Sequence, residues 1–138
     1  NKSTILKLVN LSIMSGTNSK HVASLELIYK DEQIEISGSG NGPVDAVFSC
    51  ISKVIGFNPK LMQYSINAIT PDSDAQGEVS VKLEYKGKEF IGRASDIDII
   101  VASAKSYINT CNKILNLSNN NNIQEGISEI SISKIKGI

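Results

Sequence analysis

The sequence lacks the residue types that mark many nucleic-acid and membrane surfaces. It has no tryptophan, four tyrosines and three phenylalanines in 138 residues, and so few aromatic rings argue against a base-stacking surface. Basic and acidic residues number 14 each, which gives a formal net charge of zero. The chain therefore has neither the basic footprint of a nucleic-acid-binding protein nor a polybasic membrane surface. We expect no nucleic-acid partner and no membrane partner.

Cysteines are few, and long apolar runs and a signal peptide are missing. Cys50 and Cys111 are too far apart for metal-ligand spacing, and they are predicted to be small buried side chains in a reducing compartment. No apolar run approaches the ~20 residues of a membrane span, and no signal peptide opens the chain. We therefore expect a cytoplasmic protein. Because the first residue is Asn1 and not Met, we also expect a piece of a longer polypeptide.

Residues with catalytic chemistry are also scarce. His21 is the only histidine and lies beside a predicted turn, so a surface position is favoured over a catalytic one. Neither a complete Walker A motif nor a complete GxGxxG motif occurs. Asp72, Asp74 and Glu78 could bind a cation or perform acid–base work, but Asp residues after Pro71 are typical of a solvated turn. We expect no catalysis by this chain and no cofactor within it.

Apolar and polar residues alternate through the first half of the chain, which predicts half-buried strands over 9–13, 23–29 and 34–36. Lys30-Asp31-Glu32 is the predicted hairpin turn between the second and third strands. An amphipathic helix is predicted from Pro43, with Gly56 as its C-terminal stop.

The same order of elements returns after a shift of 56 positions. The aligned pairs include Leu27 with Leu83, Tyr29 with Tyr85 and Val44 with Ile100. One unit of three strands and a helix cannot enclose a core, whereas two packed units can. The sequence therefore predicts an α+β fold of two pseudo-symmetric βββα units, at about 5–57 and 61–116, packed together and dimeric.

The end of the chain has a different composition. Residues 116–122 are rich in Asn and Ser and have no apolar periodicity, which predicts a linker. A folded domain is thus predicted over 1–117. Residues 118–138 are predicted to be a linker and a tail, either docked or disordered.

A glycine-rich stretch, residues 38–47, joins the third strand to the first helix. Its three glycines allow a tight backbone, Pro43 suits the first helical position, and Asp45 lies where the helix dipole favours a negative charge. Two interpretations stay open at this point: an ordinary strand-to-helix joint, or a cradle of backbone N–H groups for a ligand.

Several segments in order resemble the C-terminal regulatory domain of 2-isopropylmalate synthases. They are Gly40-Asn41-Gly42-Pro43-Val44-Asp45-Ala46-Val47, residues 64–70 and 74–79, and residues 98–100 and 102–109. The resemblance covers Leu6 to Leu115 and implies a homodimer that binds leucine for feedback inhibition of leucine biosynthesis. It also implies a catalytic barrel on the same polypeptide. That barrel would use a divalent metal in a Claisen-type condensation of acetyl-CoA with 2-oxoisovalerate, and it is not contained in this chain.

The resemblance implies a set of effector-binding residues: Asn41, Gly42, Val44, Leu61, Tyr64, Ala68, Ala75 and Ser95. The apolar members of this set would line the side chain of the effector. Asn41 and Gly42 would turn their backbone toward it, with the helix N-terminus facing its carboxylate.

One segment departs from the family pattern. Ala94, Ser95 and Ile97 stand where the family usually has a glycine, an apolar pocket residue and a threonine. Because Ser95 would make one wall of the pocket more polar, three alternatives stay open. They are a leucine sensor, an isoleucine sensor like that of the related citramalate synthases, and a dimerisation module that has lost its effector.

Overall fold

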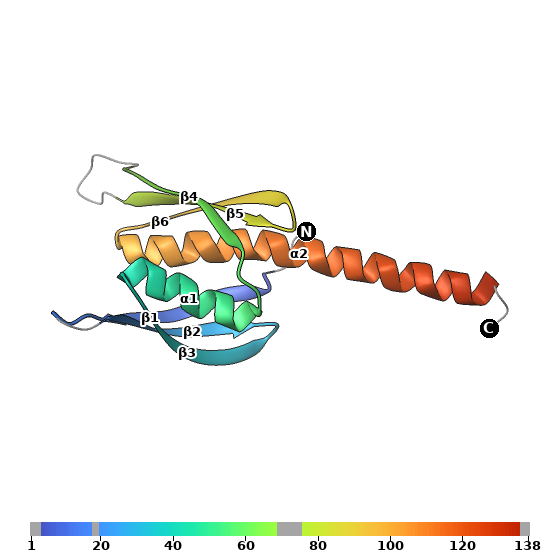
Figure 1. The fold of residues 1–138 in the computed structure, drawn as a ribbon, viewed down its shortest axis with the longest axis horizontal. Coiled ribbons are helices and arrows are strands. Elements are labelled where there is room, and N and C mark those ends of the chain that lie inside the picture. Colours follow the sequence, from blue (N-terminus) through green and yellow to red (C-terminus); the bar gives the residue numbers. More distant parts are fainter. Residues whose placement is uncertain (1–3, 18–19, 69–75, 136–138) are drawn as a thin grey trace.

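Two antiparallel three-stranded sheets enclose a layer of two helices (Figure 1). The computed structural model describes residues 4–17, 20–68 and 76–135, with side chains described through residue 119 except at residue 68. Strand order is β1-β2-β3 in the first sheet and β4-β5-β6 in the second. The predicted α+β class and the two βββα units are confirmed.

The two units repeat the same elements, with strands of nine residues each but helices of 13 and 37 residues. The first consists of β1 (Leu6–Met14), β2 (His21–Tyr29), β3 (Glu32–Gly40) and α1 (Pro43–Ile55). The second consists of β4 (Lys60–Ala68), β5 (Gly77–Tyr85), β6 (Lys88–Asp96) and α2 (Ile99–Ile135).

The predicted hairpin turn at Lys30-Asp31-Glu32 is present, and the equivalent turn of the second unit shares its geometry. Lys30 and Asp31 have φ of 52° and 65°, and Lys86 and Gly87 have φ of 51° and 78°. Two consecutive left-handed residues are the hallmark of the two-residue turn whose twist matches that of the flanking strands. These turns fix the register of β2 against β3 and of β5 against β6.

The core lies between the sheets, and an aromatic cluster joins its two halves. The inward residues of the central strands, among them Leu27 and Leu83, are fully buried. Phe48 of α1 stacks on Tyr107 of α2 with ring centroids 4.2 Å apart. Phe48 also makes a T-shaped contact with the ring of Tyr64 on β4, with ring centroids 6.1 Å apart. The aromatic cluster of Phe48, Tyr107 and Tyr64 therefore packs the first unit against the second.

A single side chain ties the start of the chain to α2. The Asn112 Oδ1 accepts the backbone N–H groups of Ile5 at 3.0 Å and Leu6 at 2.8 Å. Its Nδ2 donates to the carbonyl oxygen of Leu6 at 2.8 Å. The first strand of the first unit is thus bonded to the helix of the second unit.

Helix α2 is longer than the periodicity predicted. Its backbone is helical across the predicted linker and on to Ile135, and its C-terminal half extends well beyond both sheets (Figure 1). Asn and Ser are weak but tolerated helix formers, and no proline or glycine interrupts the sequence between Ile99 and Gly126. The domain boundary at residue 117 stays a prediction. Within the described ranges, neither helix combines the length and apolarity needed to cross a membrane.

Candidate functional site

The glycine-rich stretch brings the end of β3 against the first turn of α1. A Cβ added to Gly40 would lie 2.6 Å from the backbone nitrogen of Ala46, so only glycine allows this close approach. Gly42 is the N-cap in an extended conformation, with φ of −147°, and among the described residues no side chain caps the helix there. The Asp45 Oδ2 accepts the backbone N–H of Asn41 at 3.0 Å. The stretch is therefore a tight joint whose helix end lacks a side-chain cap.

The equivalent end of α2 is capped by its own side chains. Asp98, which aligns with Gly42 in the repeat, accepts the N–H groups of Ile100 at 2.8 Å and Val101 at 3.4 Å through Oδ1. The Asp96 Oδ1 in turn accepts the N–H of Asp98 at 2.9 Å. Donors at the start of α2 are thus already satisfied, so the two helix ends differ in what they offer a ligand.

A second difference concerns the contact between the strand end and the helix. The Lys105 Nζ lies 3.2 Å from Asp96 Oδ2 and bridges β6 to α2. The N–H of Asp98 and then the Lys105 ammonium hold the pKa of Asp96 below its usual value. In the first unit the aligned residues are Gly40 and Ser49, which carry no charge, and the strand end there lies directly against the first turn of α1.

A groove of about 520 Å³ lies along α1 where the chain enters β4. We call it the α1 groove. It is lined by Ser39, Asp45, Phe48, Ser49, Ser52, Asn58, Pro59, Lys60, Leu61 and Tyr107. Phe48, Tyr107 and Leu61 contribute apolar surface, and Tyr107 and three serines contribute hydroxyl groups. Asp45 and Lys60 are the charged residues of the lining, and Lys60 pairs with Glu84 next to the inward pair of Leu61 and Leu83, so its side chain lies on the outer face of the second sheet.

Five of the predicted effector-binding residues lie in α1, β4 or the joint before α1. Asn41, Gly42 and Val44 lie together at the start of α1, with Val44 half-buried against the core. Leu61 lines the α1 groove and is 46% exposed. Tyr64 faces the helices, and its hydroxyl oxygen lies 2.6 Å from Ser103 Oγ.

Of the other three predicted residues, the structure describes the side chain of Ser95 alone, and it lies elsewhere. Ser95 pairs with Glu78, while the adjacent pair is Ala94 with the buried Val79. Since successive side chains alternate between faces, Ser95 lies on the outer face of the second sheet, away from the helices and from Tyr64. Ala75 and the side chain of Ala68 lie outside the described residues. The effector-binding set as a whole stays a prediction.

Several residues of the groove have no binding signal in the sequence. Helical periodicity assigns Phe48 and Tyr107 to buried helix faces, and Lys60 directly follows the turn residues Asn58 and Pro59. Phe48 follows Val44 by four residues, so the two side chains lie on the same face of α1. That spacing is the one signal that could have placed Phe48 beside a predicted pocket residue.

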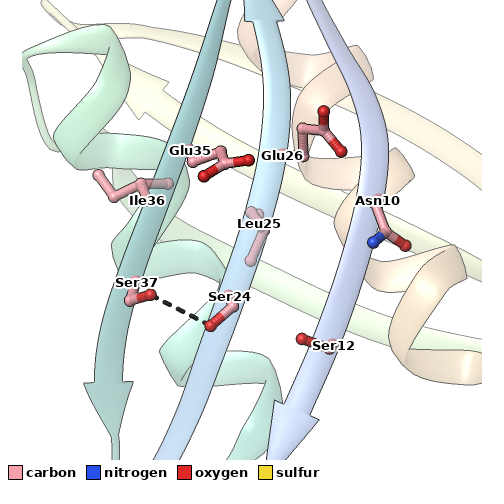
Figure 2. Close-up of a pocket in the computed structure, with 8 residues that line it drawn as sticks. All are labelled: Asn10, Ser12, Ser24, Leu25, Glu26, Glu35, Ile36 and Ser37. Carbon is pink, nitrogen blue, oxygen red and sulfur yellow. Dashed lines mark hydrogen bonds between the residues drawn. The ribbon is translucent and has the colours of Figure 1, made fainter.

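A second hollow, on the outer face of the first sheet, has different chemistry. Glu26 and Glu35 are direct cross-strand partners there and lie side by side (Figure 2). The hydroxyl oxygens of Ser24 and Ser37 lie 3.1 Å apart in the next row (Figure 2). Two facing carboxylates and a row of hydroxyls do not form an apolar slot, so this hollow does not suit the side chain of a branched-chain amino acid.

Metal chemistry has no support in the part of the chain that the structure describes. There, no three His, Cys, Asp or Glu side chains gather closely enough to hold a metal ion. Asp72 and Asp74, the acidic residues of the alternative metal-binding hypothesis, lie outside the described residues.

Comparison with known proteins adds to this geometry. A family model described as the LeuA allosteric (dimerisation) domain matches residues 1–115. A 2-isopropylmalate synthase of Heliobacterium modesticaldum is 48% identical over 105 residues, which are 76% of this chain and 20% of that protein. The corresponding enzyme of Aquifex aeolicus is 43% identical over 110 residues, 80% of this chain and 21% of that protein. That of Syntrophus aciditrophicus is 42% identical over 108 residues, 78% of this chain and 21% of that protein. The chain thus spans about a fifth of the length of these relatives.

Proposed function

This chain belongs to the family of LeuA allosteric (dimerisation) domains, and we propose that it is the leucine-sensing regulatory domain of a 2-isopropylmalate synthase. In this proposal leucine binds between α1 and β4 and inhibits the condensation of acetyl-CoA with 2-oxoisovalerate by a catalytic domain on the same polypeptide. The observation that carries the proposal is the family match over residues 1–115, together with the groove that lies along α1 where the chain enters β4.

The chemistry of this region suits a small amino acid with an apolar side chain. Such a ligand needs an apolar slot and a few polar groups that fix its orientation. Val44, Leu61 and Tyr64 supply apolar surface on two neighbouring elements. The start of α1 adds polar backbone groups without a side-chain cap from the described residues.

We propose further that the functional form is a homodimer. Leu61 and Ile66 of β4 pair with the inward residues Leu83 and Val79, and yet they are 46% and 49% exposed. Both helices leave this edge strand partly uncovered on its inner face. A second copy that covers it would bury apolar surface next to the predicted effector pocket.

Regulation then requires that leucine bind one arrangement of the units or protomers more tightly than another, because only differential affinity shifts an equilibrium. A coupling of about 1–3 kcal/mol is typical of allosteric systems. It would change the activity of a linked catalytic domain several-fold or more.

Calorimetric titration of the 138-residue chain with leucine, isoleucine and valine tests the proposal. We expect saturable binding of leucine, tighter than that of the other two. Tighter binding of isoleucine would instead identify the sensor type of the citramalate synthases. If none of the three binds at millimolar concentration, the chain is a dimerisation module without a branched-chain effector.

A further inference from the structure

We infer that Asn41 is a site of spontaneous deamidation, and that this modification alters the joint between β3 and α1 as the protein ages. The sequence holds a single Asn-Gly pair, Asn41-Gly42. Glycine after asparagine favours the reaction because it has no Cβ to hinder the approach of its backbone nitrogen. Asn41 is exposed, so water and base reach its side chain. The chemistry is independent of the proposed function, whereas its effect on effector binding rests on that function.

The reaction joins the side chain of Asn41 to the backbone of Gly42. A base removes the proton from the Gly42 amide, and the nitrogen attacks Cγ of Asn41. The N–Cγ bond forms, the Cγ–Nδ2 bond breaks and ammonia leaves with the proton that the base returns, so that a five-membered succinimide ring remains. Water then opens the ring. Cleavage at Cγ gives aspartate, and cleavage at the backbone carbonyl gives isoaspartate, in which the main chain runs through the side chain.

The local structure leaves the attacking nitrogen accessible. In the described part of the chain, the N–H of Gly42 donates no hydrogen bond to another backbone group. A Cβ built on Gly42 would meet no described atom within 4 Å, so the space beside this residue is open. The attack therefore breaks no backbone bond of Gly42 N–H and displaces no packed neighbour.

The other described asparagines lie where the same attack is hindered. Asn10 and Asn67 lie within β1 and β4, and the asparagines from residue 109 onward lie within α2. Regular backbone of this kind must open locally before it can rotate, which costs free energy. Asn58 is followed by Pro59, which has no backbone N–H to attack with.

Deamidation would change a joint that is already tightly packed. A Cβ at Gly40 would lie 2.6 Å from the backbone nitrogen of Ala46, and Asp45 Oδ2 accepts the N–H of Asn41 at 3.0 Å. Isoaspartate adds one main-chain carbon between that N–H and the start of α1. Either product also adds a carboxylate beside Asp45, and like charges repel. Because Asn41 and Gly42 belong to the predicted effector-binding set, we expect the modified chain to melt at a lower temperature and to bind leucine more weakly.

The test incubates the purified 138-residue chain at mildly alkaline pH and follows each asparagine by peptide mass spectrometry. We expect Asn41 to be converted at a rate within roughly tenfold of that in the same chain unfolded by guanidinium chloride, because short joints between elements open at little cost in free energy. Asn10 and Asn67 should be converted much more slowly than Asn41.

Gly42→Ala is the matched control. Gly42 has φ of −147°, which any residue adopts, and the added Cβ meets no described atom within 4 Å. This variant should therefore fold like the wild type and be converted severalfold more slowly at Asn41. Asn41→Asp carries the added charge without the added main-chain carbon, so it should show only part of the loss that ageing causes.

Melting temperature and calorimetric titration with leucine, each before and after incubation, measure the consequence. The wild type should lose stability and leucine affinity on incubation, and Gly42→Ala should keep both. If Asn41 stays intact while the unfolded chain is converted, or if its conversion changes neither quantity, the inference is wrong and the proposed function stands. If the fresh wild type binds none of the branched-chain amino acids, the proposed function is wrong, and conversion at Asn41 with a lower melting temperature still supports the inference.

Discussion

The hydroxyl oxygen of Tyr64 on β4 lies 2.6 Å from that of Ser103 on α2. Ser103 is fully buried and donates its one hydroxyl proton to the carbonyl oxygen of Ile99 at 2.7 Å. The hydroxyl of Tyr64 must therefore be the donor in the bond between the two residues. A predicted effector-binding residue is thus bonded to the first turns of the long helix, so a ligand that moves Tyr64 acts directly on α2.

Tyr64→Phe should lower the free energy of unfolding by about 1 kcal/mol, since it removes one buried hydrogen bond and keeps the aromatic contact with Phe48. Urea denaturation measures the change. Ser103→Ala and the double variant complete a mutant cycle, in which the two effects should not add. Additive effects would mean that the hydroxyl groups do not interact in solution.

Gly92→Ala should destabilise the second unit by about 2–3 kcal/mol. A Cβ at this position would lie 2.3 Å from Thr110 Oγ1, 2.7 Å from the Thr110 backbone nitrogen and 2.9 Å from the Ser106 carbonyl oxygen. Because two of these atoms are helix backbone, β6 would have to move away from α2. Gly42→Ser is the control, since an added Cβ there meets no described atom within 4 Å. A loss in Gly92→Ala as small as that of the control would contradict the close packing.

Asp96 should make stability depend on pH in the acid range. Its pKa is lowered by the N–H of Asp98 and by Lys105, so the carboxylate stabilises the folded state above its usual pKa. That contribution is lost as the pH falls through the lowered value, below about pH 4. The difference in melting temperature between wild type and Asp96→Asn should therefore shrink on acidification. Lys105→Ala should show a smaller effect because the bond from Asp98 stays, and a constant difference at all pH values would refute the assignment.

Ile66→Glu should break the proposed homodimer while the monomer stays folded, because Ile66 is already 49% exposed in the single chain. Light scattering coupled to size-exclusion chromatography measures the molar mass. Ile91→Glu is the control, because Ile91 pairs with Lys82 on the outer face of the same sheet and should leave the mass unchanged. A dimer that survives Ile66→Glu would place the interface elsewhere.

Most of the fold could be predicted from the sequence because its determinants are local. Alternation along the strands, the Lys30-Asp31 and Lys86-Gly87 turns and the Gly42-Pro43 helix start each depend on a few adjacent residues. The length of α2 could not be predicted in this way. Asn and Ser are common in linkers, and yet they can also be part of a helix, so the composition of residues 116–122 does not decide between the two.

The site was harder to predict because it depends on register and on tertiary contacts. A family motif names Ser95 but does not give its face, which follows only from its pairing with Glu78. Likewise, the repeat aligns Ser49 with Lys105, but only the folded chain brings Lys105 to Asp96. The ion pair that joins strand to helix in the second unit therefore has no signature in either segment alone.

The bonds between Asn112 and Leu6 have a consequence for how the domain forms. During synthesis from the N-terminus, β1 lacks these bonds until more than a hundred further residues have been made. Contacts between such distant residues are formed late and slow the folding of a chain. Each half of the duplication now depends on the other, so we expect that neither half, expressed by itself, folds into a stable protein.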